Sequence, residues 1–230
     1  GQIVLITGGS KGIGRGIAQA FLAAGAEVFI CSRTPPQEPV SANQRQAIFI
    51  QADVRDPDQA QALVNQVVEQ AGRLDTLINN AGGGPPADSA SASPRFTESI
   101  IRLNLLAPLL MSQVAHSELQ ASNGNIINIA SVVGLKGYPD QAAYGASKHA
   151  VMGLTRSIAT EAAPSGIRVR AVCPGGVDTD LIRQARPDLD PATLIRTDDV
   201  AEAVLFMLKM SDSGITDFLP IRRKGSEPQL

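Results

Sequence analysis

The sequence predicts a single α/β domain built on a doubly wound parallel sheet. Short apolar runs rich in Val and Ile alternate along the chain with longer segments whose apolar residues have helical spacing. In addition, the first apolar run leads directly into a glycine-rich turn. Strands that are apolar along their whole length are usually covered on both faces, and strand–helix alternation implies right-handed crossovers. At 230 residues the chain is long enough to bury one full core.

The expected elements follow one another in a regular order. The expected strands are Ile3–Ile6, Val28–Cys31, Ala47–Ile50, Leu74–Ile78, Asn125–Ile129, Val169–Val172 and Phe218–Ile221. The expected helices are Gly12–Ala24, Asp58–Ala71, Pro94–Leu119, Gln141–Ala163 and Asp199–Met210. One crossover, 34–46, contains three prolines and no helical stripe, so we expect it to lack a helix. The polar tail 222–230 is expected to be mobile or to lie at an interface.

Composition excludes several classes of protein. The net charge of −2 does not suit a nucleic-acid partner, which would favour a basic surface. No uncharged apolar run approaches the roughly 18 residues that a membrane span needs, and no secretory segment precedes the first strand. The two cysteines, Cys31 and Cys173, cannot form a disulfide framework and lack metal-ligand spacing. We therefore expect a cytoplasmic protein with no membrane or nucleic-acid partner and no metal.

The turn after the first strand predicts a phosphate site. Thr7-Gly8-Gly9-Ser10-Lys11-Gly12-Ile13-Gly14 joins that strand to a helix. Glycines permit positive φ angles and let the backbone approach a ligand closely. The free N–H groups and the positive dipole end of the helix would then face an anion. On the first strand of such a sheet, often called Rossmann-type, this turn indicates pyrophosphate binding, although a glycine-rich turn can also be a plain connection.

The end of the second strand indicates which dinucleotide would bind. An acidic residue there would accept hydrogen bonds from a ribose 2′-OH, whereas an arginine accommodates a 2′-phosphate. No carboxylate lies in 29–37, while Arg33 and Lys11 are both available. We therefore expect NADP(H) rather than NAD(H), unless Arg33 is an ordinary solvated charge. Asp53-Val54 and Asn79–Gly82 follow the next two strands, at the edge where open α/β sheets bind ligands.

A tyrosine and a lysine give the clearest indication of catalysis. Tyr144 and Lys148 lie four residues apart in a predicted helix, hence on one face, and Ser131 follows the fifth strand. A neighbouring ammonium group lowers the pKa of a tyrosine toward the range in which it can exchange protons at neutral pH. Taken alone, this spacing is common on helix surfaces and usually inert.

These features together resemble the short-chain dehydrogenase/reductase family, over residues 1 to about 210. The resemblance is carried, in the family's order, by the Thr7–Gly14 turn, Asp53, the segment Asn79–Gly82, Asn104, Ser131, the Tyr144/Lys148 pair and the Pro174-Gly175 turn with Thr179. It implies an NADP-dependent carbonyl or alcohol oxidoreductase, acting on a small-molecule substrate. It also implies a homo-oligomer, a tetramer or a dimer.

The resemblance assigns roles to individual residues. Tyr144 would be the general acid of reduction, Ser131 would hydrogen-bond the substrate oxygen, and Lys148 would lower the pKa of Tyr144 and bind the nicotinamide ribose. Asn104 would hold a water that links Lys148 to solvent. The remaining cofactor contacts would come from Thr7, Gly8, Ser10, Lys11, Gly12, Ile13, Gly14, Arg33, Asp53, Val54, Asn80, Ala81, Gly82, Pro174, Gly175, Val177 and Thr179.

Two alternatives stay open on the sequence alone. A 3-oxoacyl-(acyl carrier protein) reductase would need cations for its acidic partner, and the segments 122–124 and 164–166, where that branch of the family carries them, have none. A non-catalytic NADP(H)-binding sensor would be expected to lose Tyr144 or Lys148, and both are present. The lid after Thr179 carries Arg183 and Arg186, which we expect to be solvated rather than to bind substrate. Arg170, where many relatives have Asn, needs a partner if it is buried.

Overall fold

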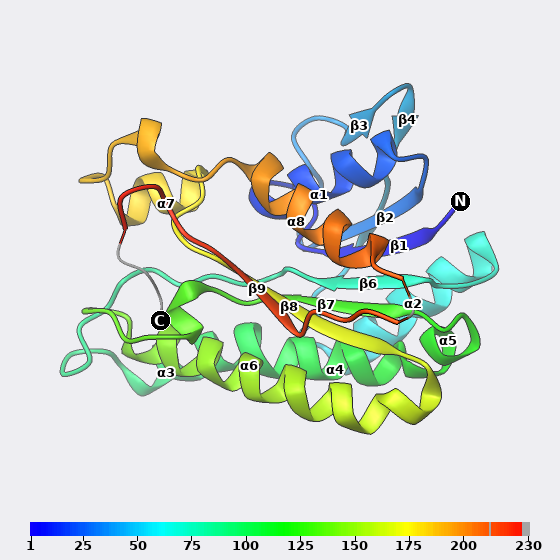
Figure 1. Ribbon diagram of the computed structural model, residues 1–230. Helices are drawn as coiled ribbons and strands as arrows, with labels where there is room; N and C mark the ends of the chain where they lie inside the picture. Colours follow the sequence, from blue (N-terminus) through cyan, green and yellow to red (C-terminus); the bar gives the residue numbers. More distant parts are fainter. Residues whose placement is uncertain (212, 227–230) are drawn as a thin grey trace.

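One sheet of parallel strands forms the centre of the molecule (Figure 1). The computed structural model describes residues 1–211 and 213–226, and within them the sheet has seven strands in the order β5-β2-β1-β6-β7-β8-β9. The strands are β1 Ile3–Thr7, β2 Glu27–Ser32, β5 Ile48–Gln51, β6 Thr76–Asn79, β7 Asn125–Ile129, β8 Arg168–Pro174 and β9 Phe218–Ile221. Every predicted strand is present, with ends within two residues of those expected.

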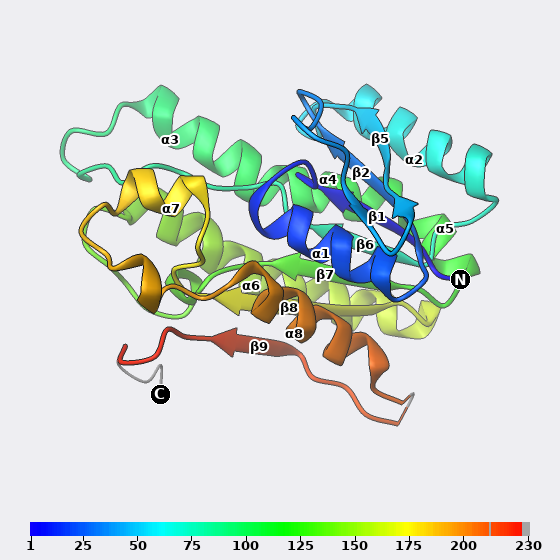
Figure 2. The same cartoon turned by 90° about the horizontal axis from the view of Figure 1, so that it is seen from above.

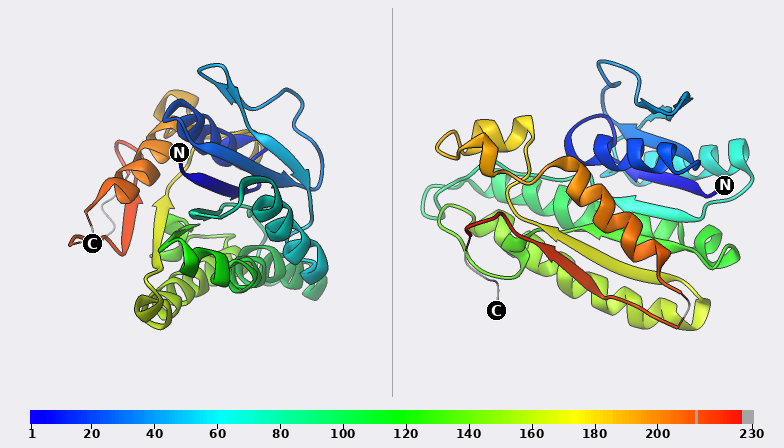
Figure 3. Two further views of the ribbon diagram at one scale, coloured as in Figure 1. Left: turned by 90° about the vertical axis from the view of Figure 1, so that its right-hand side faces the viewer. Right: turned by 45° about the horizontal axis from the view of Figure 1, so that its top comes forward.

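Helices cover both faces of the sheet, as the apolar strands predicted. Figures 1 and 3 show α1 and α8 on one face, with α2, α4 and α6 on the other. The helices are α1 Gly12–Ala23, α2 Pro57–Ala71, α3 Pro94–Ile101, α4 Ala107–Val114, α5 His116–Ala121, α6 Ala142–Ala162, α7 Asp180–Ala185 and α8 Thr197–Lys209. The fold is thus a doubly wound α/β domain of the Rossmann type.

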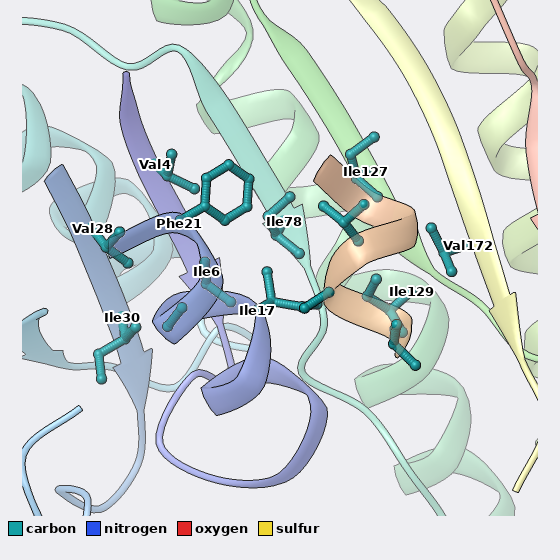
Figure 4. Packing of buried hydrophobic residues seen from close by; sticks show 14 of the residues in the cluster. Val4, Ile6, Ile17, Phe21, Val28, Ile30, Ile78, Ile127, Ile129 and Val172 are labelled. Carbon is teal, nitrogen blue, oxygen red and sulfur yellow. The ribbon is translucent and has the colours of Figure 1, made fainter. Parts of the chain in front are cut away.

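Alternate residues of β1 belong to two separate apolar layers, one on each face of the sheet. Val4 and Ile6 of β1 pack against Ile17 and Phe21 of α1, in the layer that α8 completes (Figure 4). Leu5, between them in sequence, joins the layer on the opposite face. All five residues of β1 are buried, which explains why the strand reads as a continuous apolar run.

The sheet changes direction between β1 and β6. From β1 the chain moves outward to β2 and β5, and it then returns to β6 on the other side of β1. Loops leaving β1 and β6 therefore diverge at the carboxyl edge of the sheet, the position where such sheets bind ligands. In Figure 2 the arrowheads of β7 and β9 point to the left, toward the side on which α7 lies.

The proline-rich crossover folds without a helix, as predicted. A short antiparallel pair, β3 Ser41–Ala42 and β4 Arg45–Gln46, takes the place of the helix. Arg15 of α1 holds this segment by donating to the carbonyl oxygens of Glu38 at 3.0 Å and Pro39 at 3.1 Å.

The predicted long helix Pro94–Leu119 is wrong as one continuous element. The structure divides it into α3, a π-helical turn Arg102–Leu106, α4 and α5. In the π turn the N–H of Ala107 bonds to the carbonyl of Arg102, five residues back. Pro108 has no N–H to give the carbonyl of Asn104, so a regular α-helical bond is impossible at that step. The break places Asn104 at the widened turn.

Arg170 of β8 is fully buried and points toward the end of α8. Its Nη1 donates to the carbonyl oxygen of Met207, one of the last carbonyls of that helix. Among the described residues its Nε and Nη2 have no hydrogen-bond partner. Burial, with the nearby charge of Arg168 as a smaller cause, holds the pKa of Arg170 below its ordinary value. The end of α8 thus provides a hydrogen-bond acceptor for one of the three guanidinium nitrogens.

The tail extends from β9 past the carboxyl edge of the sheet. Arg222–Ser226 fold into a turn in which Arg222 Nη1 donates to the carbonyl of Ser226 at 2.7 Å. Residues 227–230 of the expected mobile or interface segment lie outside the described residues. None of the helices in the described ranges combines the length and the apolar character that crossing a bilayer requires.

Candidate functional site

The turn between β1 and α1 is shaped for a close ligand. Gly8 and Gly12 have φ angles of +66° and +55°, which disfavour side chains. A Cβ on Gly14 would lie 2.4 Å from the Asn80 amide nitrogen. Lys11 stands at the N-cap without a side-chain cap, and the first turn of α1 holds no acidic residue. The first N–H groups of α1 are therefore open to an anion, as a pyrophosphate site requires.

The loop after β6 is joined to this turn by hydrogen bonds. The Thr7 hydroxyl accepts the N–H groups of Asn80 and Ala81, both at 3.0 Å. The Asn80 amide in turn donates to the carbonyl oxygens of Thr7 at 2.9 Å and Gly8 at 3.1 Å. Thr7 and Asn80 thus brace the glycine turn, a structural use that the sequence alone did not indicate.

The charged groups expected at the adenosine end lie on neighbouring strands. Arg33 follows β2, Asp53 follows β5, and the N–H of Ala52 bonds to the carbonyl of Ser32 at 3.2 Å. Asp53 is held by Arg55, whose Nε donates at 2.9 Å and whose Nη2 donates at 2.5 Å. This hydrogen bond is the main reason that the pKa of Asp53 lies below its usual value. Sequence reasoning missed Arg55, although an arginine two residues after an acid at a strand end was a visible signal.

Ser131 lies close enough to Tyr144 to influence its hydroxyl group. The Ser131 hydroxyl donates to the carbonyl of Pro174 at 3.3 Å and accepts the N–H of Val133 at 3.1 Å. Burial raises the pKa of Tyr144, and the nearby Ser131 hydroxyl offsets this rise only in part.

Lys148 has a different partner from the one expected. Its Nζ donates to the carbonyl of Ile129 at 2.9 Å and lies 5.7 Å from the centre of the Tyr144 ring. Burial lowers the pKa of Lys148 to about 8. The pKa of Tyr144 is raised by burial in this structure, the opposite of the direction expected from a neighbouring ammonium.

Asn104 is buried, and both the oxygen and the nitrogen of its side-chain amide form hydrogen bonds with the backbone. Its Oδ1 accepts the N–H of Gly83 and its Nδ2 donates to the Gly83 carbonyl, both at 2.9 Å. A Cβ on Gly82 would lie 2.8 Å from Asn104 Oδ1 and 3.4 Å from Lys148 Nζ. Gly82 thus lets Asn104 and Lys148 approach the same point, which is where the expected role of Asn104 places it.

The segment after β8 closes the other side of the site. The N–H of Gly175 bonds to the carbonyl of Ile221 at 2.8 Å, so β9 supports the Pro174-Gly175 turn. A Cβ on Gly12 would lie 3.3 Å from Thr179 Cγ2, and one on Gly83 would lie 3.1 Å from Leu181. The segment bearing Thr179 and Leu181 therefore lies against the loops that carry Gly12 and Gly83.

The lid contains a helix that the sequence reasoning missed. Thr179 begins α7 by accepting the N–H of Ile182 at 3.3 Å. The lid arginines are both ion-paired locally, Arg183 with Asp178 and Arg186 with Asp188. Each of the two guanidinium charges is therefore balanced by a neighbouring carboxylate.

A glycine-rich turn at the start of α1, with Ser131, Tyr144 and Lys148 near the same edge of the sheet, is the arrangement that a dinucleotide-dependent oxidoreductase requires. Residues 2–190 match the model of a family described as short chain dehydrogenase. The chain is 36% identical over 206 residues to L-fucose dehydrogenase of Oryctolagus cuniculus, covering 88% of this chain and 72% of that protein. The chain therefore belongs to the short-chain dehydrogenase family.

Solved structures agree with this assignment. Ligand-free aldohexose dehydrogenase of Thermoplasma acidophilum superimposes with a TM-score of 0.87 at 33% identity, covering 96% of this chain and 92% of that chain. The protein ElxO with NADP bound gives a TM-score of 0.84 at 32% identity, covering 96% and 97%.

Proposed function

We propose that the protein transfers a hydride between NADP(H) and the carbonyl or alcohol group of a small substrate, so that it reduces a ketone or an aldehyde in one direction. The observation that carries this proposal is the placement of Lys148 Nζ 5.7 Å from the centre of the Tyr144 ring, one helical turn along α6, with Ser131 beside Tyr144. When bound, the nicotinamide supplies or accepts the hydride; the protein must orient the reactants and move one proton.

The proposed proton donor is the Tyr144 hydroxyl, which would protonate the substrate oxygen during reduction. Ser131 would donate to the same oxygen and stabilise the charge that develops on it. Lys148 would bind the nicotinamide ribose hydroxyls, and Asn104 would hold the water through which protons are resupplied. Burial raises the pKa of Tyr144, so its hydroxyl is protonated near neutral pH, as a proton donor must be.

The cofactor would lie along the carboxyl edge, from the adenosine end at Arg33 to the nicotinamide end at Gly175. The open N–H groups of α1 would take the pyrophosphate, and Arg33 with Lys11 would take the 2′-phosphate. The further contacts proposed are those of Thr7, Gly8, Ser10, Gly12, Ile13, Gly14, Asp53, Val54, Asn80, Ala81, Gly82, Pro174, Val177 and Thr179. The NADP carried by ElxO supports this choice of cofactor.

Sugars belong in the proposed substrate range because two similar proteins are named for L-fucose and aldohexose. We also propose a single functional domain that assembles as a homodimer or homotetramer in the cytoplasm, with the tail 222–230 either mobile or at an interface. The two cysteines are free and buried, as a reducing compartment permits.

A titration followed by a substrate screen tests the proposal. The purified protein is titrated with NADPH and NADH, and reduced-nicotinamide absorbance is then followed with ketones, aldehydes, β-keto esters and, in the oxidative direction, aldoses and hydroxy acids. Tight NADPH binding with turnover of one substrate group is the expected result. Turnover only with acyl-carrier-protein thioesters would favour the 3-oxoacyl reductase, and binding without any turnover would favour a sensor.

A further inference from the structure

The adenosine end of the site holds a carboxylate as well as the cations that suit a 2′-phosphate. Asp53 and Arg33 end the neighbouring strands β5 and β2, where Ser32 pairs with Gln51. The Gln51 side chain donates to the carbonyl of Arg33 at 2.9 Å, which ties the two strand ends together. After Arg55, the charge of Arg33 is a further cause of the lowered pKa of Asp53. The opposite charges of Asp53 and Arg33 therefore attract each other between the neighbouring ends of β5 and β2.

Arg55 occupies the Asp53 carboxylate with a two-nitrogen contact. Its Nε lies 2.9 Å from Oδ1 and 3.2 Å from Oδ2, and its Nη2 lies 2.5 Å from Oδ2. The backbone N–H of Arg55 adds a bond to Oδ1 at 3.1 Å. The paired side chains are only 32% and 25% exposed, so the pair is shielded more than a typical surface pair. Both oxygens of Asp53 are thereby engaged.

Arg33 is left available by this arrangement. Within the described part of the chain, its guanidinium has neither an ion pair nor a side-chain hydrogen bond. A free Asp53 would change this in two ways, since it could capture Arg33 and would also repel a dianionic phosphate. Neither effect should change the binding of NADH, because its adenosine ribose carries a neutral 2′-hydroxyl in place of the phosphate.

We propose that Arg55 is a positioning residue for cofactor selectivity: it holds Asp53 and so keeps Arg33 available for the 2′-phosphate of NADP(H). This inference rests on the proposed cofactor. The residue acts through Asp53 and need not touch the phosphate. Its signature is therefore a change in the ratio of the dissociation constants for NADH and NADPH, and that change must depend on the presence of the Asp53 carboxylate.

The experiment is a set of titrations of the full chain with NADPH and with NADH, read by nicotinamide fluorescence. Arg55→Gln should weaken NADPH binding by roughly three- to ten-fold, the effect expected of one uncompensated charge at this range, and leave NADH binding unchanged. The double variant Asp53→Asn/Arg55→Gln should return the ratio to within about two-fold of wild type, because the freed carboxylate is gone. Arg33→Gln should lose the preference for NADPH.

Arg73→Gln is the matched control. Arg73 pairs with Asp75, also two residues away in sequence, through Nε at 3.1 Å. This pair precedes β6 and so lies at the opposite edge of the sheet from Asp53. Its loss should leave both dissociation constants unchanged.

Four results would overturn the proposal. An equal loss of NADPH and NADH binding in Arg55→Gln would mean a merely structural role at the adenosine end, as would a double variant in which the ratio of the two dissociation constants stays shifted. An unchanged ratio in Arg55→Gln would mean that Asp53 does not compete for Arg33. A wild-type preference for NADH would overturn the proposed cofactor itself, and it is seen before any variant is made.

Discussion

Lys148 is bonded to the carbonyl oxygen of Ile129, at the end of β7, with a distance of 2.9 Å from Nζ. The side chain is only 5% exposed, and burial lowers its pKa to about 8. The strand that leads to Ser131 therefore also holds the lysine in place. A charged group kept in such a site destabilises the folded chain, so retaining Lys148 implies a function that needs the ammonium there.

Replacing this lysine should stabilise the protein while abolishing its activity. Below pH 8 both the folded and the unfolded chain hold the proton, so the buried ammonium costs its full desolvation. Between pH 8 and about 10.4 the unfolded chain binds more protons, and the cost disappears as the pH rises. Lys148→Met should raise the free energy of unfolding at pH 7 by about 1–3 kcal/mol, with the difference shrinking by pH 10.

Urea unfolding at pH 7 and pH 10 measures this difference directly. Lys209→Met, at an exposed position of α8, serves as the control and should show no such dependence on pH. A Lys148→Met variant that is less stable at pH 7 would mean that the bond to Ile129 outweighs desolvation.

Removing the Tyr144 hydroxyl should separate binding from chemistry. Tyr144→Phe keeps the ring but deletes the proposed proton donor beside Ser131. We expect turnover to fall by roughly 10²- to 10⁴-fold, the usual contribution of a general acid, with the dissociation constant for NADPH unchanged. Steady-state rates and fluorescence titration check the two parts. The protein's other tyrosine, Tyr138, is 37% exposed, and Tyr138→Phe should retain activity. Turnover that survives in Tyr144→Phe would refute the mechanism.

A methyl group added to the phosphate turn should block cofactor binding. A Cβ on Gly14 would lie 2.4 Å from both the Asn80 amide nitrogen and the Gly8 carbonyl oxygen, so the turn must move. Gly14→Ala should therefore lose NADPH binding. The same substitution at Gly153 in α6 meets no atom within 4 Å and should stabilise the protein by about 0.5–1 kcal/mol through helix propensity. Titration with NADPH and thermal unfolding of both variants test these expectations. Normal NADPH binding by Gly14→Ala would contradict the proposed pyrophosphate site at the glycine-rich turn.

A buried polar chain links β6, β7 and α6. Asn79 donates to Asn128 and Asn128 donates to Thr155, both at 2.9 Å, and Thr155 bonds back to the carbonyl of Val151 at 2.7 Å. Thr155→Val keeps the shape but leaves the Asn128 amide without an acceptor. We expect a loss of about 1–3 kcal/mol in unfolding free energy.

Thr160 offers the matched comparison for this loss. Its hydroxyl also bonds four residues back, to Arg156 at 3.0 Å, but it is exposed. Thr160→Val should change the unfolding free energy by less than about 0.5 kcal/mol. Equal effects at the two positions in chemical unfolding would show that the chain through Asn128 adds nothing.

The sequence predicted the sheet because its signals are local. Apolar runs, glycines and strand–helix order are properties of short segments, and they placed every strand of the seven-stranded sheet and the glycine-rich turn after β1. Contacts between segments were not visible in the same way. The bond of Lys148 to Ile129 joins a helix to a strand 19 residues away, and the reuse of Asn80 as a brace depends on β1 and β6 being neighbours. The direction of the Tyr144 pKa shift was missed for this reason, since burial is a property of the folded chain.

Helix boundaries failed where one residue changes the hydrogen-bond pattern. Apolar spacing continued across Pro94–Leu119, but Pro108 and the π turn at Asn104 divide that segment. The lid helix α7 is short, with none of its residues buried, so its sequence has no apolar stripe that would reveal it. Arg55 was overlooked because a salt bridge at a strand end resembles an ordinary pair of solvated charges.

Arg170 should be replaceable with a gain in stability. Its guanidinium is fully buried, and among the described residues only Nη1 has a partner, the Met207 carbonyl. Buried ionic groups are often matched or exceeded by apolar residues of similar volume, because the desolvation of the charge disappears. Arg170→Met should raise the free energy of unfolding by about 1–3 kcal/mol in urea titrations. Arg45→Met, on the exposed strand β4, should change it by less than about 0.5 kcal/mol. A loss of stability in Arg170→Met would show that Nε and Nη2 are hydrogen-bonded in solution and that the guanidinium ties β8 to more than the end of α8.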